Sequence, residues 1–207
     1  MKEDRQTREN LLKSAKKEFL EKGYNASSLR SICKNAGVTT GALYFFFQDK
    51  EDLFSSIVAE PLQHLYELIS KHYVEEVEKI ETGDTHDRGL LFINEDMHMN
   101  LVMEIADYLF QYKDEFNLLL SKAQGTRYEN CMDEIIEITN AHSQKMADQI
   151  CENMGREKIE PFTIHWIAHL QIDVFVQVLL HGISKKEAEN HLKTAISFLV
   201  RGWQGMF

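Results

Sequence analysis

Apolar residues recur at helical spacing along most of the chain. A first stripe, ended by Gly23, predicts a helix over residues 4–22 with a buried side made of Leu11, Leu12, Ala15, Phe19 and Leu20. A second stripe, ended by Gly37, consists of Leu29, Ile32, Cys33 and Ala36. Repeats of i, i+3, i+4 and i+7 put such residues on one face of a helix. The pattern predicts an all-α fold.

The segment from residue 36 to 53 predicts a tight turn, a short amphipathic helix and the start of a longer helix. In the short helix one face holds Leu43, Phe46 and Phe47, and the other holds Gly41, Tyr44, Phe45 and Gln48. The expected N-caps are Ser27 or Ser28 for the second helix, Thr39 for the third, and Asp49 with Asp52 for the fourth. A striped helix, a turn and a second short helix form the layout of a DNA-reading helix-turn-helix.

Beyond residue 53 the pattern predicts further helices. The fourth helix should continue toward Val77, with Pro61 as a kink or local break. Residues 81–87 read as a loop, and the capping-box pattern of residues 126–129 places a helix boundary near residue 125. Pro161 opens a helix that is apolar on nearly every side, and residues 184–187 match a second capping box before the last helix.

The last two expected helices suggest a hairpin that pairs with its twin in a four-helix interface. Burial of the apolar helix in a large monomeric core is the alternative. The residues predicted to face the twin are Trp166, Leu170, Phe175, Leu179, Leu192, Leu199 and Trp203.

Charge is distributed unevenly over the 207 residues, whose net charge is −10. Residues 1–50 hold ten Lys and Arg against six Asp and Glu, whereas residues 51–207 hold thirteen against twenty-seven. A basic head on an acidic body favours approach to a phosphate backbone by the head. No apolar run approaches the ~20 residues of a membrane span and no secretion signal is present, so we expect a cytoplasmic protein without membrane contact. Three widely spaced cysteines suggest neither a disulfide framework nor a zinc site.

The amino-acid sequence of the N-terminal segment resembles that of the TetR family of bacterial transcriptional regulators. The motifs are the Ala-Gly-Val-Thr turn, the Gly-Ala-Leu-Tyr-Phe-Phe-Phe run and the Asp-Lys-Glu-Asp-Leu continuation, preceded by the Gly23-Tyr24 break. Beyond residue 55 the likeness is much looser. The resemblance implies residues 1–49 as a helix-turn-helix DNA-binding domain and residues 50–207 as a helical ligand-binding and dimerisation domain. It also implies a homodimer on a double-stranded DNA operator, controlled by a small-molecule effector.

Candidate DNA contacts divide into positioning and reading residues. For positioning we expect Ser28, Thr39, Tyr44 and Lys50, of which Thr39, Tyr44 and Lys50 match backbone-contacting positions of the family. Arg5 and Arg8 are expected to supply a flexible arm to the phosphates or the minor groove. The base-reading set is Thr40, Gly41, Ala42 and Phe45. None of these four is the arginine that commonly reads guanine, and their methyl and ring groups favour thymine methyls. We therefore expect an A/T-rich palindromic operator.

Aromatic and methionine residues gather between residues 92 and 132, where the family has its ligand cavity. The candidate ligand contacts are Met99, Met103, Asp107, Tyr108, Tyr112, Gln124, Arg127 and Tyr128. Thioethers and rings suit a small, mainly apolar effector, although ordinary helical core explains most of the same residues. His165 and His169 have a chelating i, i+4 spacing, but without a nearby cysteine a packing or interface role is favoured, and we assign neither metal nor cofactor.

Two other function classes compete with a ligand-responsive repressor. An enzyme has little support, because the chain holds no Gly-rich phosphate loop, nucleophile elbow or His-Glu-x-x-His pattern. A helical protein-interaction or ligand-binding module without DNA binding would use the same exposed aromatics for a protein partner. The salt dependence of DNA binding separates the two remaining classes.

Overall fold

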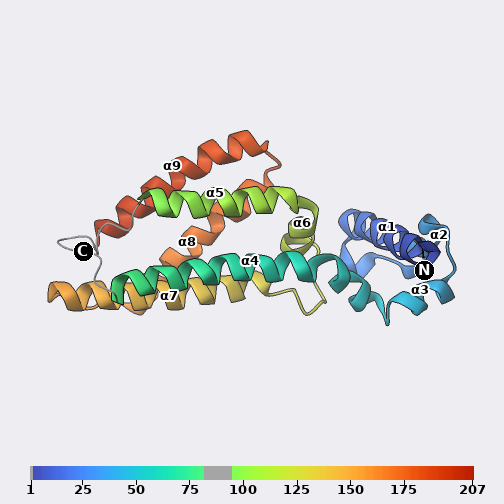
Figure 1. Ribbon diagram of the computed structural model, residues 1–207, viewed down its shortest axis with the longest axis horizontal. Helices are drawn as coiled ribbons and strands as arrows, with labels where there is room; N and C mark the ends of the chain where they lie inside the picture. The colour runs from blue at the N-terminus through green and yellow to red at the C-terminus, as the bar shows by residue number, and fades with distance from the viewer. Residues whose placement is uncertain (1, 82–94) are drawn as a thin grey trace. The chain divides into compact units, whose positions relative to one another are not determined.

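The computed structural model describes residues 2–81 and 95–207, and within these ranges the chain is helical apart from its turns. In chain order the elements are α1 (Lys2–Ala26), α2 (Leu29–Ala36), α3 (Thr40–Phe46), α4 (Lys50–Glu81), α5 (Glu95–Gln111), α6 (Lys113–Ser121), α7 (Cys131–Met154), α8 (Pro161–Leu180) and α9 (Lys185–Gln204) (Figure 1). The predicted all-α fold is confirmed. Apart from Glu81, the last residue of α4, the expected loop at 81–87 lies outside the described residues.

The chain divides into two compact units. The first contains residues 1–64 and 112–131, and the second contains residues 65–111 and 132–207. The first unit is thus larger than residues 1–49, because it also includes the first turns of α4, all of α6 and the turn that follows α6. A separate DNA-binding function for residues 1–49 stays a prediction.

The first unit is built around the apolar faces that the sequence predicts. Leu11, Ala15 and Phe19 of α1 are fully buried, as are Ile32 of α2 and Leu43 of α3. Ring contacts add an aromatic cluster of Phe19, Tyr24, Phe54 and Tyr128. Burial of several large side chains fixes how α1, α2 and α3 pack together.

Most of the predicted helix ends are confirmed. Gly23 leaves the helical conformation with φ 76°, Pro61 lies inside α4, and Pro161 is the first residue of α8. The Asp49 carboxylate accepts the Asp52 N–H at 2.8 Å. The helix boundary near residue 125 is wrong: Thr126 and its neighbours form turns, and α7 begins at Cys131.

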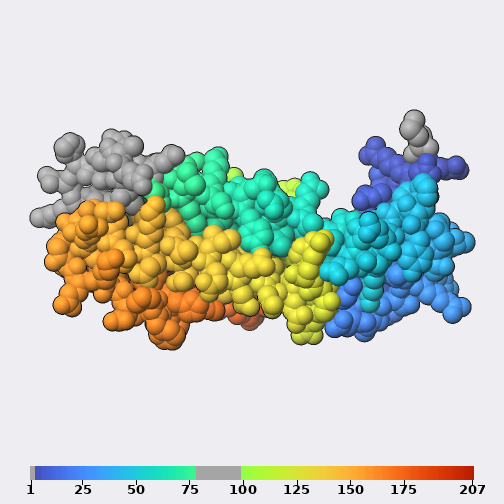
Figure 2. Space-filling view, turned by 90° about the horizontal axis from the view of Figure 1, so that it is seen from below, coloured from blue at the N-terminus to red at the C-terminus, as the bar shows by residue number. Residues whose placement is uncertain are grey.

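The second unit contains two apolar clusters that involve α9. In one, α5 and α9 bury Val102, Ala106, Ala188, Leu192 and Ile196. In the other, α7 and α8 bury Met146, Ile150 and Ile164 against Trp203 and Phe207. The later turns of α4 and α7 lie side by side (Figure 2), joined by a hydrogen bond from the Tyr73 hydroxyl to Thr139 Oγ1 at 3.0 Å.

Helix α8 is not buried on every side within one chain. Phe162 is 79% exposed and Trp166 is 59% exposed, whereas Ile164 and Ala168 on the other face are fully buried. By length and composition alone α8 is also the one described helix that could cross a membrane, with a mean hydropathy of 1.3. One such helix is weak evidence for a membrane span, and an apolar face that meets another protein surface gives the same pattern.

Candidate nucleic-acid interface

The turn between α2 and α3 is shaped by Gly37 and Thr39. Gly37 adopts the left-handed conformation with φ 72°, and its N–H donates to the Lys34 carbonyl at 3.2 Å. Thr39 Oγ1 then accepts the Ala42 N–H at 3.1 Å and caps α3. A fully buried Leu43 holds the short helix on the core. The opposite face of α3 therefore points to solvent in a fixed orientation.

That outer face carries two large aromatic side chains. Phe45 is 76% exposed and Tyr44 is 58% exposed. The Phe45 ring meets the half-buried Phe46 ring edge to face, with centroids 4.9 Å apart. Thr40 and Gly41 are exposed beside them and Ala42 is half-buried. Three of the four predicted base-reading residues, Thr40, Gly41 and Phe45, are thus exposed, and base contact by this set stays a prediction.

The start of α2 is capped differently from the prediction. Ser28 occupies the N-cap position and is exposed, but its side chain makes no capping hydrogen bond. Instead the Glu18 carboxylate accepts from the Ser28 N–H at 3.4 Å and from the Ser31 hydroxyl at 2.9 Å. Lys22 donates to the same carboxylate at 2.7 Å. Glu18 is thus a buried tertiary cap that the sequence pattern did not reveal.

Lys50 is directed toward the junction of α1 and α2. Its ammonium donates to the Ser27 carbonyl at 2.8 Å and to the Asn25 carbonyl at 3.4 Å, and it lies 4.6 Å from the centre of the Tyr24 ring. Burial lowers the pKa of Lys50, while the Glu18 carboxylate acts in the opposite direction. Lys50 therefore stabilises the junction of α1 and α2, and its phosphate contact remains a prediction.

Arg8 is the predicted contact on α1. Its guanidinium is exposed and lies 5.4 Å from the centre of the Phe47 ring, beside the end of α3. Arg5, one turn earlier, pairs with Glu9 at 3.0 Å. A cation stacked on a ring keeps its outer N–H groups available to solvent.

The predicted ligand contacts belong to both compact units. Met99 and Met103 pack against the α5–α9 cluster, Tyr108 is half-buried, and the exposed Asp107 pairs with Lys185 at 2.7 Å. Tyr112, Gln124, Arg127 and Tyr128 belong to the first unit. There the Arg127 guanidinium donates to Ser55 Oγ at 2.8 Å. Several of these residues thus have structural partners already, and a ligand role for all eight stays a prediction.

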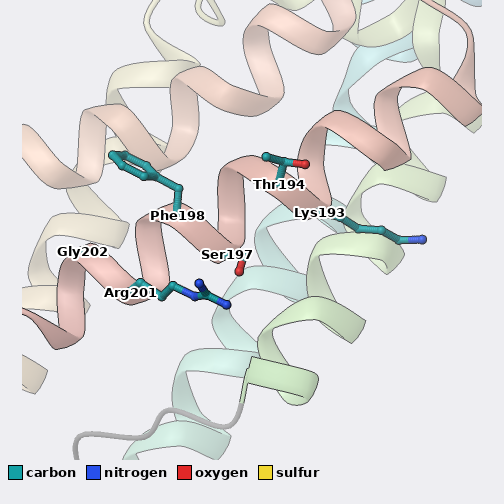
Figure 3. A pocket seen from close by; sticks show the side chains of 6 residues that line it. All are labelled: Lys193, Thr194, Ser197, Phe198, Arg201 and Gly202. Carbon is teal, nitrogen blue, oxygen red and sulfur yellow. The ribbon is translucent and has the colours of Figure 1, made fainter.

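A surface hollow of about 680 Å³ lies along α9 (Figure 3). Its lining consists of Lys193, Thr194, Ser197, Phe198, Arg201 and Gly202. All six residues come from α9, and none is a predicted ligand contact. The hollow combines the exposed Phe198 ring with two basic side chains.

A buried polar cluster joins α4 and α7 in the second unit. Glu76 is 5% exposed, and its two carboxylate oxygens lie 3.2 Å from His72 Nε2 and 2.7 Å from His142 Nε2. The Tyr73 ring stacks on His142 with centroids 3.9 Å apart, and burial raises the pKa of Tyr73 to about 12. The i, i+4 spacing of His72 and Glu76 was the available sequence signal, and it is too common on helices to identify the cluster.

The predicted interface residues divide into exposed and buried groups. Trp166 and Leu170 are exposed, and Phe175 and Leu199 are half-buried. Leu179, Leu192 and Trp203 are 3%, 0% and 7% exposed within the single chain. These three are buried within the single chain, whereas Phe162, Leu180 and Phe198 are exposed, and the interface itself stays a prediction.

Comparisons with known proteins agree with this arrangement. The model of the family described as bacterial regulatory proteins, tetR family, matches residues 11–57. The HTH-type transcriptional repressor BepR of Brucella suis biovar 1 (strain 1330) is 53% identical over 53 residues, which are 26% of this chain and 25% of BepR. The HTH-type transcriptional repressor AcnR of Corynebacterium efficiens is 23% identical over 180 residues, 86% of this chain and 84% of AcnR.

The likeness in fold extends over nearly the whole chain. A transcriptional regulator structure from Aquifex aeolicus VF5 has a TM-score of 0.59 at 20% identity, covering 93% of this chain and 98% of that one. The match to BepR, by contrast, spans about a quarter of that relative's length. The family model covers only part of the chain, namely most of α1, all of α2 and α3 and the start of α4.

Proposed function

This chain belongs to the TetR family of bacterial regulatory proteins, and we propose that it is a DNA-binding transcriptional repressor that works as a homodimer in the cytoplasm. Its target is a palindromic double-stranded DNA operator, from which a small, mainly apolar molecule releases it. The family is one of regulators and not of enzymes. Two relatives, BepR and AcnR, are themselves named repressors.

The observation that carries the proposal is the exposed face of α3. Phe45 and Tyr44 leave 76% and 58% of their surface to solvent, on a helix whose other face is fixed by the buried Leu43. Large exposed apolar side chains on a rigid element mark an interaction site. The dimensions of an α-helix fit the major groove of B-DNA. Phosphates would be contacted by Thr39, Tyr44 and Arg8 around this face.

The preference for A/T-rich sites follows from the same face. The base-reading set supplies a phenyl ring, methyl groups and one hydroxyl, which suit the thymine methyl group but offer no bidentate hydrogen bonds to guanine. An operator selected from random sequence should therefore contain A/T-rich half-sites about 34–36 Å apart, one helical turn of DNA. Guanine-rich half-sites would contradict this part of the proposal.

The test is fluorescence anisotropy on an operator selected from random DNA by the wild-type protein. Phe45→Ala should lose about tenfold or more of the discrimination between selected and unselected DNA, because a base contact is removed. Tyr44→Phe removes only the hydroxyl and should weaken binding to both DNAs by the same few-fold factor. Val74→Ala, at a position that is 56% exposed on α4, is the control and should bind like wild type.

Salt separates this function from an interaction module that uses the same aromatics. The logarithm of DNA affinity should fall with the logarithm of salt at a slope of about −0.9 per neutralised phosphate. A module that binds a protein partner should show little binding to any DNA at any salt concentration. If a folded protein gave that result, the proposed repressor function would be wrong and the interaction-module function would take its place.

A further inference from the structure

His165 and His169 lie on the side of α8 that a single chain leaves uncovered. Phe162, Trp166 and the two histidines recur at helical spacing, so they form one stripe along the helix. Phe162 is 79% exposed and Trp166 is 59% exposed. The centroids of the Phe162 and His165 rings lie 6.4 Å apart. A homodimer that covers the two aromatic side chains therefore covers the histidine pair as well.

The two imidazole rings meet through their ring nitrogens. The Nε2 atoms of His165 and His169 lie 3.1 Å apart, and the ring planes are inclined by 78°. At this distance one Nε2–H donates to the lone pair of the other Nε2, which requires that at least one ring is neutral. When both rings are protonated, two N–H groups face each other and the hydrogen bond is lost.

The charged groups around the pair favour one tautomer. Glu137 of α7 has its Oε1 4.0 Å from Nδ1 of His165, which favours a proton on that nitrogen and leaves Nε2 as the acceptor. His169 is then the donor. The Glu137 side chain is 68% exposed, so solvent screens its attraction for added protons.

Other carboxylates offer the pair little compensation for a second proton. Asp173, one turn beyond His169, is exposed and accepts from the Gln177 amide at 2.9 Å. In the part of the chain that the structure describes, no carboxylate of α5 or α9 lies within ion-pair distance of either ring. A doubly protonated pair therefore has no closely placed negative charge to balance it.

We propose that protonation of the His165–His169 pair dissociates the homodimer as the pH falls through the range in which histidine changes charge, about pH 5 to 8. This inference rests on the dimer put forward in the proposed function. In the dimer the pair is removed from water, where a second proton breaks the hydrogen bond and places two like charges side by side. In the monomer both rings can turn toward water and take up that proton. Since two separate chains then bind more protons than the dimer, the affinity between them falls with the pH.

The overall charge of the protein acts in the opposite direction. The chain carries a net charge of −10, which repels a second copy, and a fall in pH reduces that repulsion. Acidification should therefore tighten association unless a specific group resists protonation in the dimer. A dimer that weakens at lower pH consequently reports on a local group such as the histidine pair.

The experiment is sedimentation equilibrium of the full-length protein at pH 8.0 and pH 6.0, at one ionic strength. The dissociation constant of the wild-type dimer should rise about fivefold or more at the lower pH, because each of two pairs excludes a proton. The double variant His165→Gln/His169→Gln should show no such rise, because its two amides hydrogen-bond at either pH without taking up a proton. The matched control is His64→Gln, which removes an exposed histidine of α4 and should keep the wild-type response.

The single variant His165→Gln separates a coupled pair from two independent histidines. The amide oxygen that replaces the imidazole can accept from a protonated His169, so most of the rise should disappear. Independent histidines would each keep about half of the logarithmic rise, and that result would overturn the pairing.

The remaining outcomes distinguish this inference from the dimer on which it rests. A wild-type dimer of equal affinity at both pH values, or a rise that persists in the double variant, overturns the inference and leaves the dimer standing. A wild-type protein that is monomeric at pH 8.0 overturns the dimer and the inference with it. Circular dichroism at both pH values confirms that each variant is folded, which surface substitutions on one helix should permit.

Discussion

Glu18 is a single residue of α1 that fixes the contact between α1 and the start of α2. It is 3% exposed and accepts hydrogen bonds from Lys22, Ser31 and the Ser28 N–H. The Lys22 contact, followed by those of Ser31 and Ser28, outweighs burial and lowers the pKa of Glu18 from its ordinary value of 4.5. A group with a lowered pKa in the folded state contributes stability above its unfolded pKa and loses it as the pH falls.

Glu18→Gln should therefore lower the free energy of unfolding by about 1.5–3 kcal/mol at pH 7, the range for hydrogen bonds to a charged group. The difference from wild type should shrink as the pH falls below about 4.5, where the unfolded chain takes up the proton, and should vanish once the pH falls below the lowered pKa of the folded carboxylate. Urea denaturation at several pH values measures both effects. Glu21→Gln is the matched control, because Glu21 is exposed on the same helix and pairs only loosely with Lys17, at 3.9 Å. Equal losses for the two variants would contradict the capping role.

The sequence predicted caps that depend on neighbours in the chain and missed those that depend on tertiary contacts. Thr39 and Ser184 accept hydrogen bonds from N–H groups three residues ahead, so spacing alone identified them. Glu18 lies ten residues before the N–H that it caps, and Lys50 bonds to carbonyls 23 and 25 residues earlier. Local patterns carry no information about such partners.

At the scale of elements, the turn after α6 shows that a segment can match the capping-box pattern and still form a turn instead of a helix start. Glu129 does bond backward, as a capping box requires, but its carboxylate accepts from the Gly125 N–H at 2.9 Å within a turn. Gly125 has φ +83°, and a Cβ there would lie 2.5 Å from Asn25 Oδ1 at the end of α1. Glycine is needed for both the conformation and the close approach.

Gly125→Ala should destabilise the protein by about 1–2 kcal/mol from the left-handed backbone alone, plus about 1 kcal/mol for displacing Asn25. Gly155→Ala is the control, because it has φ +62° with no atom within 4 Å of the new Cβ and so shows the backbone cost by itself. Thermal and urea unfolding measure the two variants. Asn25→Ala placed in the Gly125→Ala background should recover the excess, and a failure to recover it would show that α1 and this turn are not coupled through Asn25.

For the whole molecule, the apolar pattern predicted helices better than it predicted what covers them. Leu192 and Phe198 lie on the same helix. Apolar residues at helical spacing do not tell which of the two faces α5 and which faces solvent. The structure assigns Leu192 to the core, with 0% exposed, and leaves Phe198 74% exposed. Phe198 on α9 and Phe162 and Trp166 on α8 are all exposed, and the proposed dimer depends on these side chains.

Trp166→Glu should convert the dimer into a monomer. Burial of a large apolar side chain is worth about 1.5–3 kcal/mol, and a two-fold interface loses two copies, about 3–6 kcal/mol in all, before the cost of burying the charge. Sedimentation velocity at micromolar protein measures the change, and Val74→Glu, at a position that is 56% exposed on α4, should stay dimeric. The monomer should also bind a full palindrome more than about tenfold more weakly, because one head must then act alone, while its affinity for a half-site stays that of wild type. A Trp166→Glu protein that still sediments as a dimer would move the interface away from α8.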